Sequence, residues 1–219
     1  MTVYLGIPMY GGAHGLAVGS LLSLQAHLME KGHTVLFDIV ANGSILPKVR
    51  NGIVKRFIDS NAEVLVFIDS DMVYEPQAIE KLINAPFDVS VINYRVKSTN
   101  VKYMAEAVRE ECEVVGTVYL GDTWIQTTRA GTGIMAIKRR TIEHITTPYL
   151  SYIDNGVEYH ALFDFCLSDG HYYGEDYTFC RRVEAAGGQI FILADADAGH
   201  IGDTVYMGNY HNHLKGQPS

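Results

Sequence analysis

The sequence has 219 residues, of which 47% are hydrophobic and 19% are charged, and its formal net charge is −8 at pH 7. This composition is that of a globular protein that can bury a sizeable core. The acidic balance argues against a broad nucleic-acid-binding surface, because such surfaces are basic. A phosphorylated small molecule would be bound through a metal ion, backbone N–H groups or a few local cations.

The cysteines and the hydropathy pattern narrow the setting. Cys112, Cys166 and Cys180 are widely spaced and form no CxxC pair, so neither a structural zinc site nor a disulfide framework is predicted. The first residues have the pattern of a strand and not of a signal peptide. Because no apolar run has the length of a membrane span, we expect no span and a cytoplasmic location.

The first half of the chain alternates between predicted strands and helices. Short apolar runs predict strands at residues 3–7, 34–40, 63–69 and 88–94, and helical spacing predicts helices at 16–31, 45–60 and 76–84. This alternation is typical of an α/β protein with a mostly parallel central sheet and helices on both faces. Ligands of such sheets bind outside the carboxyl ends of the strands.

The second half has a different pattern. Antiparallel strands are predicted at residues 112–120 and 122–128, further strands at 133–138 and 189–193, and a helix at 176–186. Residues 149–165 are rich in aromatic and acidic residues but lack periodicity. We expect this half to extend the same sheet with mixed or antiparallel strands, so that residues 1–219 form one domain.

Two aspartates follow the third predicted strand. Asp69 and Asp71 come directly after the apolar run from Val64 to Ile68. Carboxylates this close repel each other, but they suit a hard divalent cation such as Mg²⁺ or Mn²⁺. The alternative is a solvated strand end, because D-x-D patterns often arise by chance.

Two later features add candidate chemistry. Glu175 and Asp176 follow Gly174 between aromatic residues, where a carboxylate could act as a general base. The alternative is that acids at a helix start only complement the helix dipole. His200 lies between glycines after the last predicted strand, and its imidazole would suit Mn²⁺. The alternative is a surface-loop histidine.

In this order, the three features resemble the glycosyltransferases of the GT-A (Rossmann-like) fold, and among them the family-two-like enzymes of bacteria and large viruses. The resemblance covers most of the chain. It is also carried by Ile7-Pro8-Met9-Tyr10, Arg50-Asn51, the run from Asn93 to Lys97, and the glycine-rich run from Ala130 to Arg139. It implies a metal-dependent transferase that moves a hexosyl group from a nucleoside-diphosphate-sugar, with a UDP-sugar favoured, to a hydroxyl of a glycan or other acceptor.

The resemblance also implies roles for particular residues. Asp71 and His200 would bind Mn²⁺ or Mg²⁺, with Asp69 bound through water or to the ribose. Asp176, or otherwise Glu175, would accept the proton of the acceptor hydroxyl. Residues 1–97 would bind the donor and residues 98–219 the acceptor, in a bacterial or virus-infected cell. The implied donor contacts are Pro8, Tyr10, Arg50, Asp69, Ser70 and Lys97, with Arg129 as a further candidate for the diphosphate.

Two other functions fit parts of the pattern. A haloacid-dehalogenase-type phosphatase also carries D-x-D-x-(T/V) after an apolar strand, and the segment from Asp69 to Val73 matches it. That motif normally lies on the first strand of its core, whereas here it follows the third. A catalytically inactive nucleotide-sugar-binding module would bind without turnover, but the intact acid pair Glu175-Asp176 argues against it.

Overall fold

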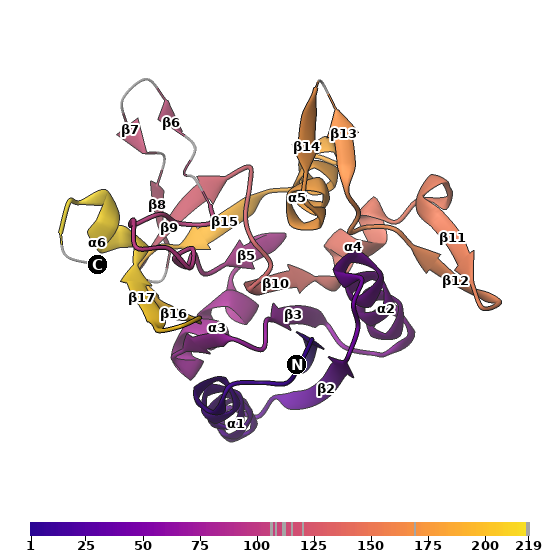
Figure 1. Cartoon of the computed structure of the whole chain (residues 1–219), viewed down its shortest axis with the longest axis horizontal. Coiled ribbons are helices and arrows are strands. Elements are labelled where there is room, and N and C mark those ends of the chain that lie inside the picture. Colours follow the sequence, from indigo (N-terminus) through magenta and orange to yellow (C-terminus); the bar gives the residue numbers. More distant parts are fainter. Residues whose placement is uncertain are drawn as a thin grey trace.

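A single large sheet forms the centre of the molecule (Figure 1). The structure is a computed structural model that describes residues 1–105, 107, 109–110, 113–114, 116–119, 121–168 and 170–217. Within these residues the sheet has eight strands in the order β2-β1-β3-β10-β5-β15-β9-β8. The strands are β1 (Thr2–Met9), β2 (Thr34–Ala41), β3 (Val64–Ile68), β5 (Val89–Val91), β8 (Gly116–Tyr119), β9 (Asp122–Thr127), β10 (Ile134–Lys138) and β15 (Ile190–Leu193).

Most strands of this sheet run in one direction. β1 is parallel to β2 and β3, and β5 is parallel to β15, whereas β10 and β9 run against their neighbours. The predicted mostly parallel α/β fold is therefore confirmed. One placement differs from the prediction. β10 comes from the second half of the chain, yet it lies between β3 and β5 instead of extending the sheet. Its residues Ile134 to Ile137 are all buried, which suits a strand covered on both faces.

Helices cover both faces of the sheet and form two hydrophobic clusters. α1 (Gly15–Glu30) and α3 (Pro76–Asn84) pack on one face, and α2 (Leu46–Asp59), α4 (Arg139–Ile145) and α5 (Glu175–Ala185) pack on the other. Side chains of β3 alternate between the two clusters, as the period of a strand requires. The helices predicted at 16–31, 45–60, 76–84 and 176–186 are present to within a residue at each end. α4 was not predicted.

Smaller elements surround the sheet. A second sheet joins β4 (Met72–Tyr74), β16 (Asp197–Ile201) and β17 (Val205–Asn209), and α6 (Tyr210–Leu214) follows it. Two hairpins project from the body: β11 (Ser151–Asp154) with β12 (Val157–His160), and β13 (Cys166–Ser168) with β14 (His171–Tyr173). A 3₁₀ turn, η1 (Pro148–Leu150), and the short pair β6 (Arg109–Glu110) and β7 (Glu113–Val114) complete the elements. Part of the strand predicted at 112–120 lies outside the described residues.

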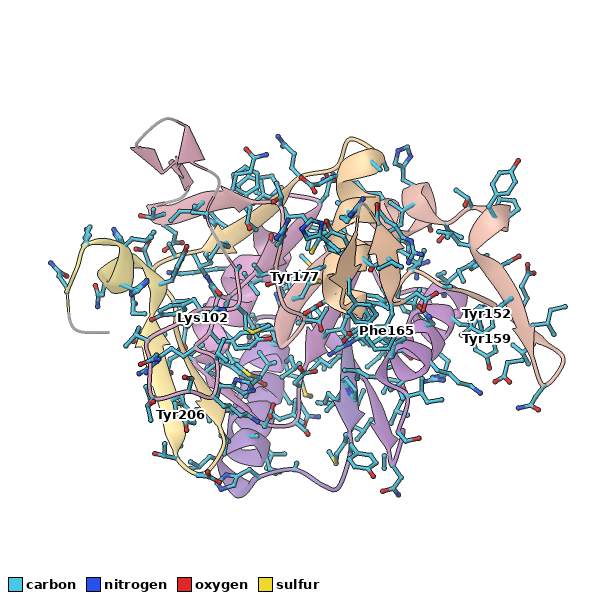
Figure 2. All side chains as sticks on the ribbon, turned by 45° about the horizontal axis from the view of Figure 1, so that its top comes forward. Lys102, Tyr152, Tyr159, Phe165, Tyr177 and Tyr206 are labelled. Atoms are coloured by element: carbon cyan, nitrogen blue, oxygen red, sulfur yellow. The ribbon has the colours of Figure 1, made fainter. Side chains whose placement is uncertain are left out.

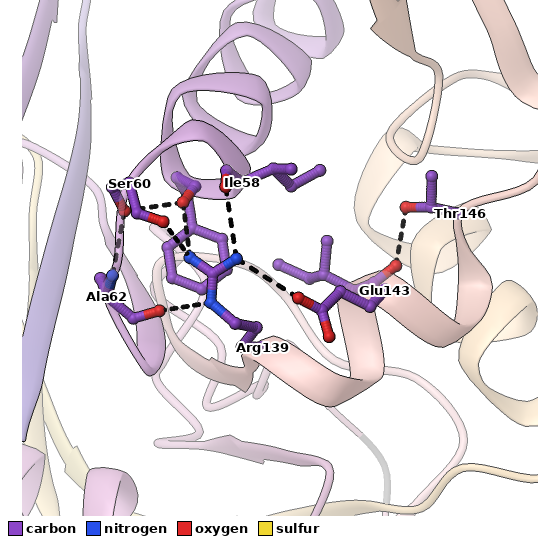
Figure 3. A network of polar contacts seen from close by, with 8 residues as sticks. Ile58, Ser60, Ala62, Arg139, Glu143 and Thr146 are labelled. Carbon is purple, nitrogen blue, oxygen red and sulfur yellow. Dashed lines mark hydrogen bonds and ion pairs between the residues drawn. The ribbon is translucent and has the colours of Figure 1, made fainter.

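The start of α4 is tied to the end of α2 through one side chain. The Arg139 guanidinium donates to the carbonyl oxygens of Phe57, Ser60 and Ala62 at 2.6–2.8 Å, and to that of Ile58 at 3.3 Å (Figure 3). The last carbonyls of a helix have no partner within the helix, so these bonds satisfy groups that would otherwise need water. The positive charge also complements the negative end of the α2 dipole.

The structure bears on the predictions of no disulfide framework and no membrane span. Cys166 and Cys180 are free thiols, and Cys112 lies outside the described residues. In the part of the chain that the structure describes, no helix has the length and apolar character needed to cross a bilayer.

The Arg139 contacts lead to a stability prediction. We expect Arg139→Met to lower the free energy of unfolding by about 2 kcal/mol, because it leaves several carbonyls at the end of α2 without a donor. The matched control is Arg140→Met, which removes the neighbouring arginine, whose side chain is 65% exposed and pairs with Asp88. The control should cost less than about 1 kcal/mol. Urea denaturation of both variants measures the difference, and equal losses would contradict the role of Arg139.

Candidate functional site

The motifs that carry the predicted chemistry come together near the carboxyl end of β3. The backbone fixes the turn there, because the Asp69 N–H donates to the Gly133 carbonyl at 2.9 Å and the Met72 N–H donates to the Asp69 carbonyl at 3.2 Å. Neighbouring elements then bring in the other motifs. The acids and the histidine assembled in this way are Asp69, Asp71, Glu175, Asp176 and His200.

A buried arginine joins two of these motifs. Arg50 of α2 is 1% exposed, its Nη2 donates to Asp69 Oδ1 at 3.0 Å, and its Nε lies 3.5 Å from Glu175 Oε1. Burial lowers the pKa of Arg50, but the charges of Asp69 and Glu175 outweigh burial and raise it. The guanidinium also packs 5.3 Å from the Phe67 ring centroid. The direct donor contact of Arg50 stays a prediction, and the structure shows its side chain enclosed against Asp69 and Glu175.

Asp71 forms a second cluster with His200 and Lys97. Pairing of β16 with β4 sets His200 opposite Met72, and the Ile201 N–H donates to the Asp71 carbonyl at 2.8 Å. Lys97 Nζ donates to Asp71 Oδ2, and His200 Nε2 lies 3.4 Å from the same oxygen. Burial raises the pKa of Asp71, but hydrogen bonds from His200 and Lys97 outweigh it and lower the pKa to about 2. Asp71 is therefore a carboxylate at any ordinary pH.

The orientation of His200 fits a metal ligand. Its Nδ1 lies 3.0 Å from the Arg95 carbonyl, which can only accept, so Nδ1 carries the proton. Nε2 faces the Asp71 carboxylate at 3.4 Å, and a metal ion bound between the two groups would take the place of the proton on Nε2. A carboxylate in front of the imidazole and a carbonyl behind it are typical of metal ligands and their outer partners. In the described ranges, no group of three or more His, Cys, Asp or Glu residues could hold a metal. Oxygens of a bound substrate would have to complete the coordination.

The two acids at the start of α5 have different surroundings. Glu175 faces the Arg50 guanidinium, whereas Asp176 Oδ1 accepts a hydrogen bond from the Tyr177 backbone N–H at 2.8 Å. Burial and the neighbouring charge of Glu175 raise the pKa of Asp176 to about 6. Arg50 acts on Asp176 only through a weaker, opposing effect on that pKa. Asp176 is therefore the acid whose proton affinity is close to that needed for proton transfer at neutral pH.

The glycine-rich run after residue 130 has a packing role. A Cβ at Gly131 or Gly133 would lie 2.5 Å from an atom of the Tyr94 side chain. The Gly133 N–H donates to the Tyr94 hydroxyl at 3.1 Å, and the Tyr94 ring meets the His200 ring edge-on at 5.1 Å. These glycines therefore make room for the Tyr94 side chain, which packs against His200. Packing thus explains the glycines of this run, which the resemblance assigned to the acceptor side.

The predicted donor-side residues lie around the end of β1. Pro8 is buried in the strand, Tyr10 is 75% exposed, and Ser70 Oγ donates to the Gly12 carbonyl at 3.5 Å. A cavity of about 340 Å³ opens beside Ser70, and neither Pro8 nor Tyr10 lines it. Apolar side chains of β1, β2 and α1 form most of its wall, and Asp69 and Ser70 also line it. The cavity is thus continuous with the aspartate motif.

The second D-x-D of the chain has a structural role. Asp195 accepts a hydrogen bond from the Thr123 N–H and pairs with His211 Nδ1, and Asn209 bonds both the Asp195 carbonyl and Asp197. These contacts tie α6 and β17 to the end of β15. The members of this tie are separated by up to 88 residues, so no local pattern of the sequence predicts it.

No family model and no curated protein matches this chain. The solved structures that are similar to it include three glycosyltransferases. The Drosophila β1,4-galactosyltransferase 7 mutant bound to manganese, UDP-Gal and xylobiose is 11% identical, with a TM-score of 0.48 over 98% of this chain and 72% of that one. Staphylococcus aureus TarS 1–349 bound to UDP-GlcNAc is 14% identical, with a TM-score of 0.48 over 89% of this chain and 56% of that one.

The third is a glycosyltransferase involved in glycosylation of the major capsid of PBCV-1, 11% identical with a TM-score of 0.35 over 65% of this chain. The chain spans 63% of that viral enzyme and 56% of TarS. Identities and TM-scores this low assign no family to the chain. The residues of the site therefore carry the functional case.

The environment of Asp176 predicts a gain of stability on its replacement. In the folded chain its carboxyl keeps a proton up to about pH 6, whereas in the unfolded chain it loses the proton near its model value of 3.8. Between these values the folded state binds more protons, so this group's contribution to stability falls as pH rises. We expect Asp176→Asn, which keeps the Oδ1 acceptor, to raise the free energy of unfolding at pH 7.5 by about 2 kcal/mol.

The gain should shrink toward zero below about pH 4, where the Asp176 carboxyl of the unsubstituted protein is protonated in both the folded and the unfolded state. Urea denaturation at pH 4 and pH 7.5 measures it. Asp59→Asn, at an exposed aspartate paired with Lys55, is the control and should show no gain. A loss of stability at pH 7.5 in Asp176→Asn would show that other groups of the folded protein stabilise the ionised Asp176 carboxylate.

Proposed function

We propose that this protein is a metal-dependent glycosyltransferase that moves a sugar from a nucleoside-diphosphate-sugar, with a UDP-sugar favoured, to a hydroxyl of a glycan or other acceptor. One observation carries the proposal. Arg50 holds the first aspartate of the D-x-D motif and the glutamate before Asp176 against one guanidinium. Asp71, which would bind the metal with His200, lies two residues after Asp69, and the candidate base Asp176 directly follows Glu175. The proposed metal site and the candidate base therefore both adjoin the ion cluster that Arg50 forms with Asp69 and Glu175.

The donor would lie over the end of β1 and β3. The cavity lined by Met9 and Ser70, at the end of β1 that carries Pro8 and Tyr10, has the size and the apolar lining that suit a nucleobase. The diphosphate would then extend over Asp69 and Asp71. Asp71 and His200 would hold Mn²⁺ or Mg²⁺ together with diphosphate oxygens, and the ion would stabilise the charge of the departing nucleoside diphosphate.

Lys97 would assist from the same side. Its ammonium now neutralises Asp71, and the length and flexibility of a lysine allow it to turn toward a phosphate instead. Its proposed role is to neutralise either the Asp71 carboxylate or a donor phosphate, depending on which of the two has no other cation beside it. Residues 1–97 supply these donor contacts.

Asp176 would act on the acceptor. With a pKa of about 6 it is mainly ionised at neutral pH, and it is basic enough to take the hydroxyl proton as the new glycosidic bond forms. Glu175, paired with Arg50, is the less suitable base because a nearby cation stabilises its ionised form. Residues 98–219, which include Asp176 and the aromatic residues around it, would bind the acceptor.

The phosphatase alternative requires Asp69 to act as a nucleophile. In the structure an oxygen of this carboxylate accepts a hydrogen bond from Arg50, which stabilises the anion and lowers its reactivity. In the inactive-module alternative, Asp176 would not deprotonate an acceptor hydroxyl. The phosphatase predicts a binding result that differs from that of the transferase, whereas the inactive module predicts the same binding without turnover.

Metal-dependent nucleotide binding tests the proposal. We expect UDP with Mn²⁺ at about 100 times its Kd to raise the unfolding midpoint by about 5 °C or more, because a ligand of the folded state stabilises it. Asp71→Ala should abolish the manganese-dependent part of this shift, and Asp59→Ala should retain it. GDP, ADP, CDP and TDP with and without Mn²⁺ identify the base.

The outcomes separate the alternatives. No shift with any nucleotide, together with stabilisation by fluoroberyllate and Mg²⁺, would favour the phosphatase. A metal-dependent shift without release of UDP from UDP-sugars, across hydroxyl acceptors and water, would favour the inactive module.

Arg50 is proposed as a positioning residue, and two variants separate its charge from its shape. Arg50→Lys keeps a cation but loses the forked geometry, so we expect transfer to fall by about 100-fold with little change in the acid limb of the pH profile. Arg50→Met leaves two half-buried carboxylates without a cation and should cost about 3 kcal/mol of stability. It should also move the acid limb to higher pH, because Arg50 lowers the pKa of Asp176. An unchanged limb in a folded Arg50→Met variant would contradict this role.

A further inference from the structure

Two arginines flank an aromatic residue next to Asp176. The guanidinium carbons of Arg181 and Arg129 lie 4.3 Å and 5.9 Å from the centroid of the Tyr173 ring. Tyr173 ends β14, and only Gly174 separates it from the two acids at the start of α5. We propose that Arg129 and Arg181 bind an anionic group, a carboxylate or a phosphate, on the acceptor. The inference rests on the proposed transferase function and defines its acceptor class.

The aromatic side chains at this position are held in place. Arg129 also lies 6.0 Å from the Tyr177 ring centroid, and Tyr177 directly follows Asp176. The Tyr177 hydroxyl donates to the Met104 carbonyl at 2.7 Å, which fixes the ring near the middle of the molecule (Figure 2). Tyrosine rings offer apolar faces on which a sugar ring can stack. The arginines therefore lie beside a surface that suits a saccharide.

The charge of the pair distinguishes it from the other arginines. Arg50, Arg56, Arg139 and Arg140 each pair with a carboxylate. Arg129 and Arg181 make no ion pair within the described residues, and the Arg181 guanidinium donates to the Ser168 hydroxyl at 3.2 Å. In a chain of net charge −8, two arginines without a carboxylate partner at one place can attract an anion locally.

The acid that faces the pair is Glu184. It lies three residues after Arg181 on α5. Burial raises the pKa of Glu184, while the charges of Arg129 and Arg181 lower it to a smaller extent. Glu184 makes no ion pair with either guanidinium in the part of the chain that the structure describes, so both groups keep the capacity to bind an external anion.

The location of the pair assigns the anion to the acceptor. Arg129 precedes β10, and Tyr173 and Arg181 come from β14 and α5, so all three belong to the half of the chain that carries Asp176. The proposed donor diphosphate instead has Lys97, Asp71 and His200. Guanidinium groups bind carboxylate and phosphate through paired hydrogen bonds, which makes two arginines a selective receptor for either group.

Matched pairs of probes test the inference by equilibrium binding. The first pair is p-nitrophenyl β-glucuronide and p-nitrophenyl β-glucoside, and the second is glucose 6-phosphate and glucose, each titrated by calorimetry into the full chain with UDP and Mn²⁺ present. We expect at least one anionic member to bind about 10-fold or more tightly than its neutral partner, because a hydrogen bond to a charged group has that magnitude. Comparison of the two pairs shows whether carboxylate or phosphate is preferred.

Variants assign the effect to the two arginines. Arg129→Gln and Arg181→Gln should each reduce the preference for the anionic probe, and the double variant should remove it. The control Arg140→Gln loses the same charge from an exposed site on α4 and should keep the preference. Arg181→Gln and Arg140→Gln should retain the manganese-dependent UDP shift, because neither residue is a candidate donor contact.

Several outcomes would overturn the inference. Equal binding of both members of each pair, no binding of any probe, or a preference that survives the double variant would each contradict an anionic acceptor site. If the UDP shift persists in these cases, the proposed transferase stands and only the acceptor class is wrong. Absence of the UDP shift in the native protein would instead contradict the proposed function itself.

Discussion

The ion cluster of Arg50, Asp69 and Glu175 is the interaction on which the site depends. A guanidinium this deeply buried is stable only when carboxylates compensate its charge, and the carboxylates are held in turn by its fixed geometry. Because Arg50 belongs to α2, Asp69 follows β3 and Glu175 begins α5, the cluster fixes three elements at one point. Phe67 and the stacked rings of Phe163 and Phe179 pack among the same elements and keep water away from the cluster.

The order of the strands places the remaining groups around this cluster. β10 enters between β3 and β5, and its first residues bring Gly133 against Tyr94 and the backbone of Asp69. β16 pairs with β4 immediately after Asp71, which sets His200 beside that carboxylate. The positions of His200 and Asp71 are thus set by backbone ladders, which are more rigid than loops. Such support is what a metal-binding pair requires.

The adjacent acids Glu175 and Asp176 show how one local sequence can yield two chemistries. Both occupy the first turn of α5, and the helix dipole acts on both. Their difference comes from partners elsewhere in the chain: Glu175 faces a guanidinium from α2, and Asp176 is buried without one in the described part of the chain. Helix propensity and capping cannot distinguish them, because the relevant charges are more than 100 residues apart in sequence.

The sequence by itself determined the class of fold and the kinds of chemical group. Alternating apolar runs and helical periodicity predicted most of the sheet and helices, because burial of a strand or helix face depends on local spacing. Residue type and position at the ends of strands or the start of a helix predicted Asp69, Asp71, Asp176 and His200 as candidate site residues. The hairpin of β11 and β12 was missed although Asn155 and Gly156, both with positive φ, are a typical turn signal.

Only the tertiary structure decided which of these groups meet. The position of β10 inside the sheet, the burial of Arg50 and the pairing of Asp71 with His200 all depend on contacts between distant segments. A periodic pattern shows which face of an element is buried but does not show which neighbour covers it. Strand order, and with it the charge around each acid, is therefore a property of the packed molecule.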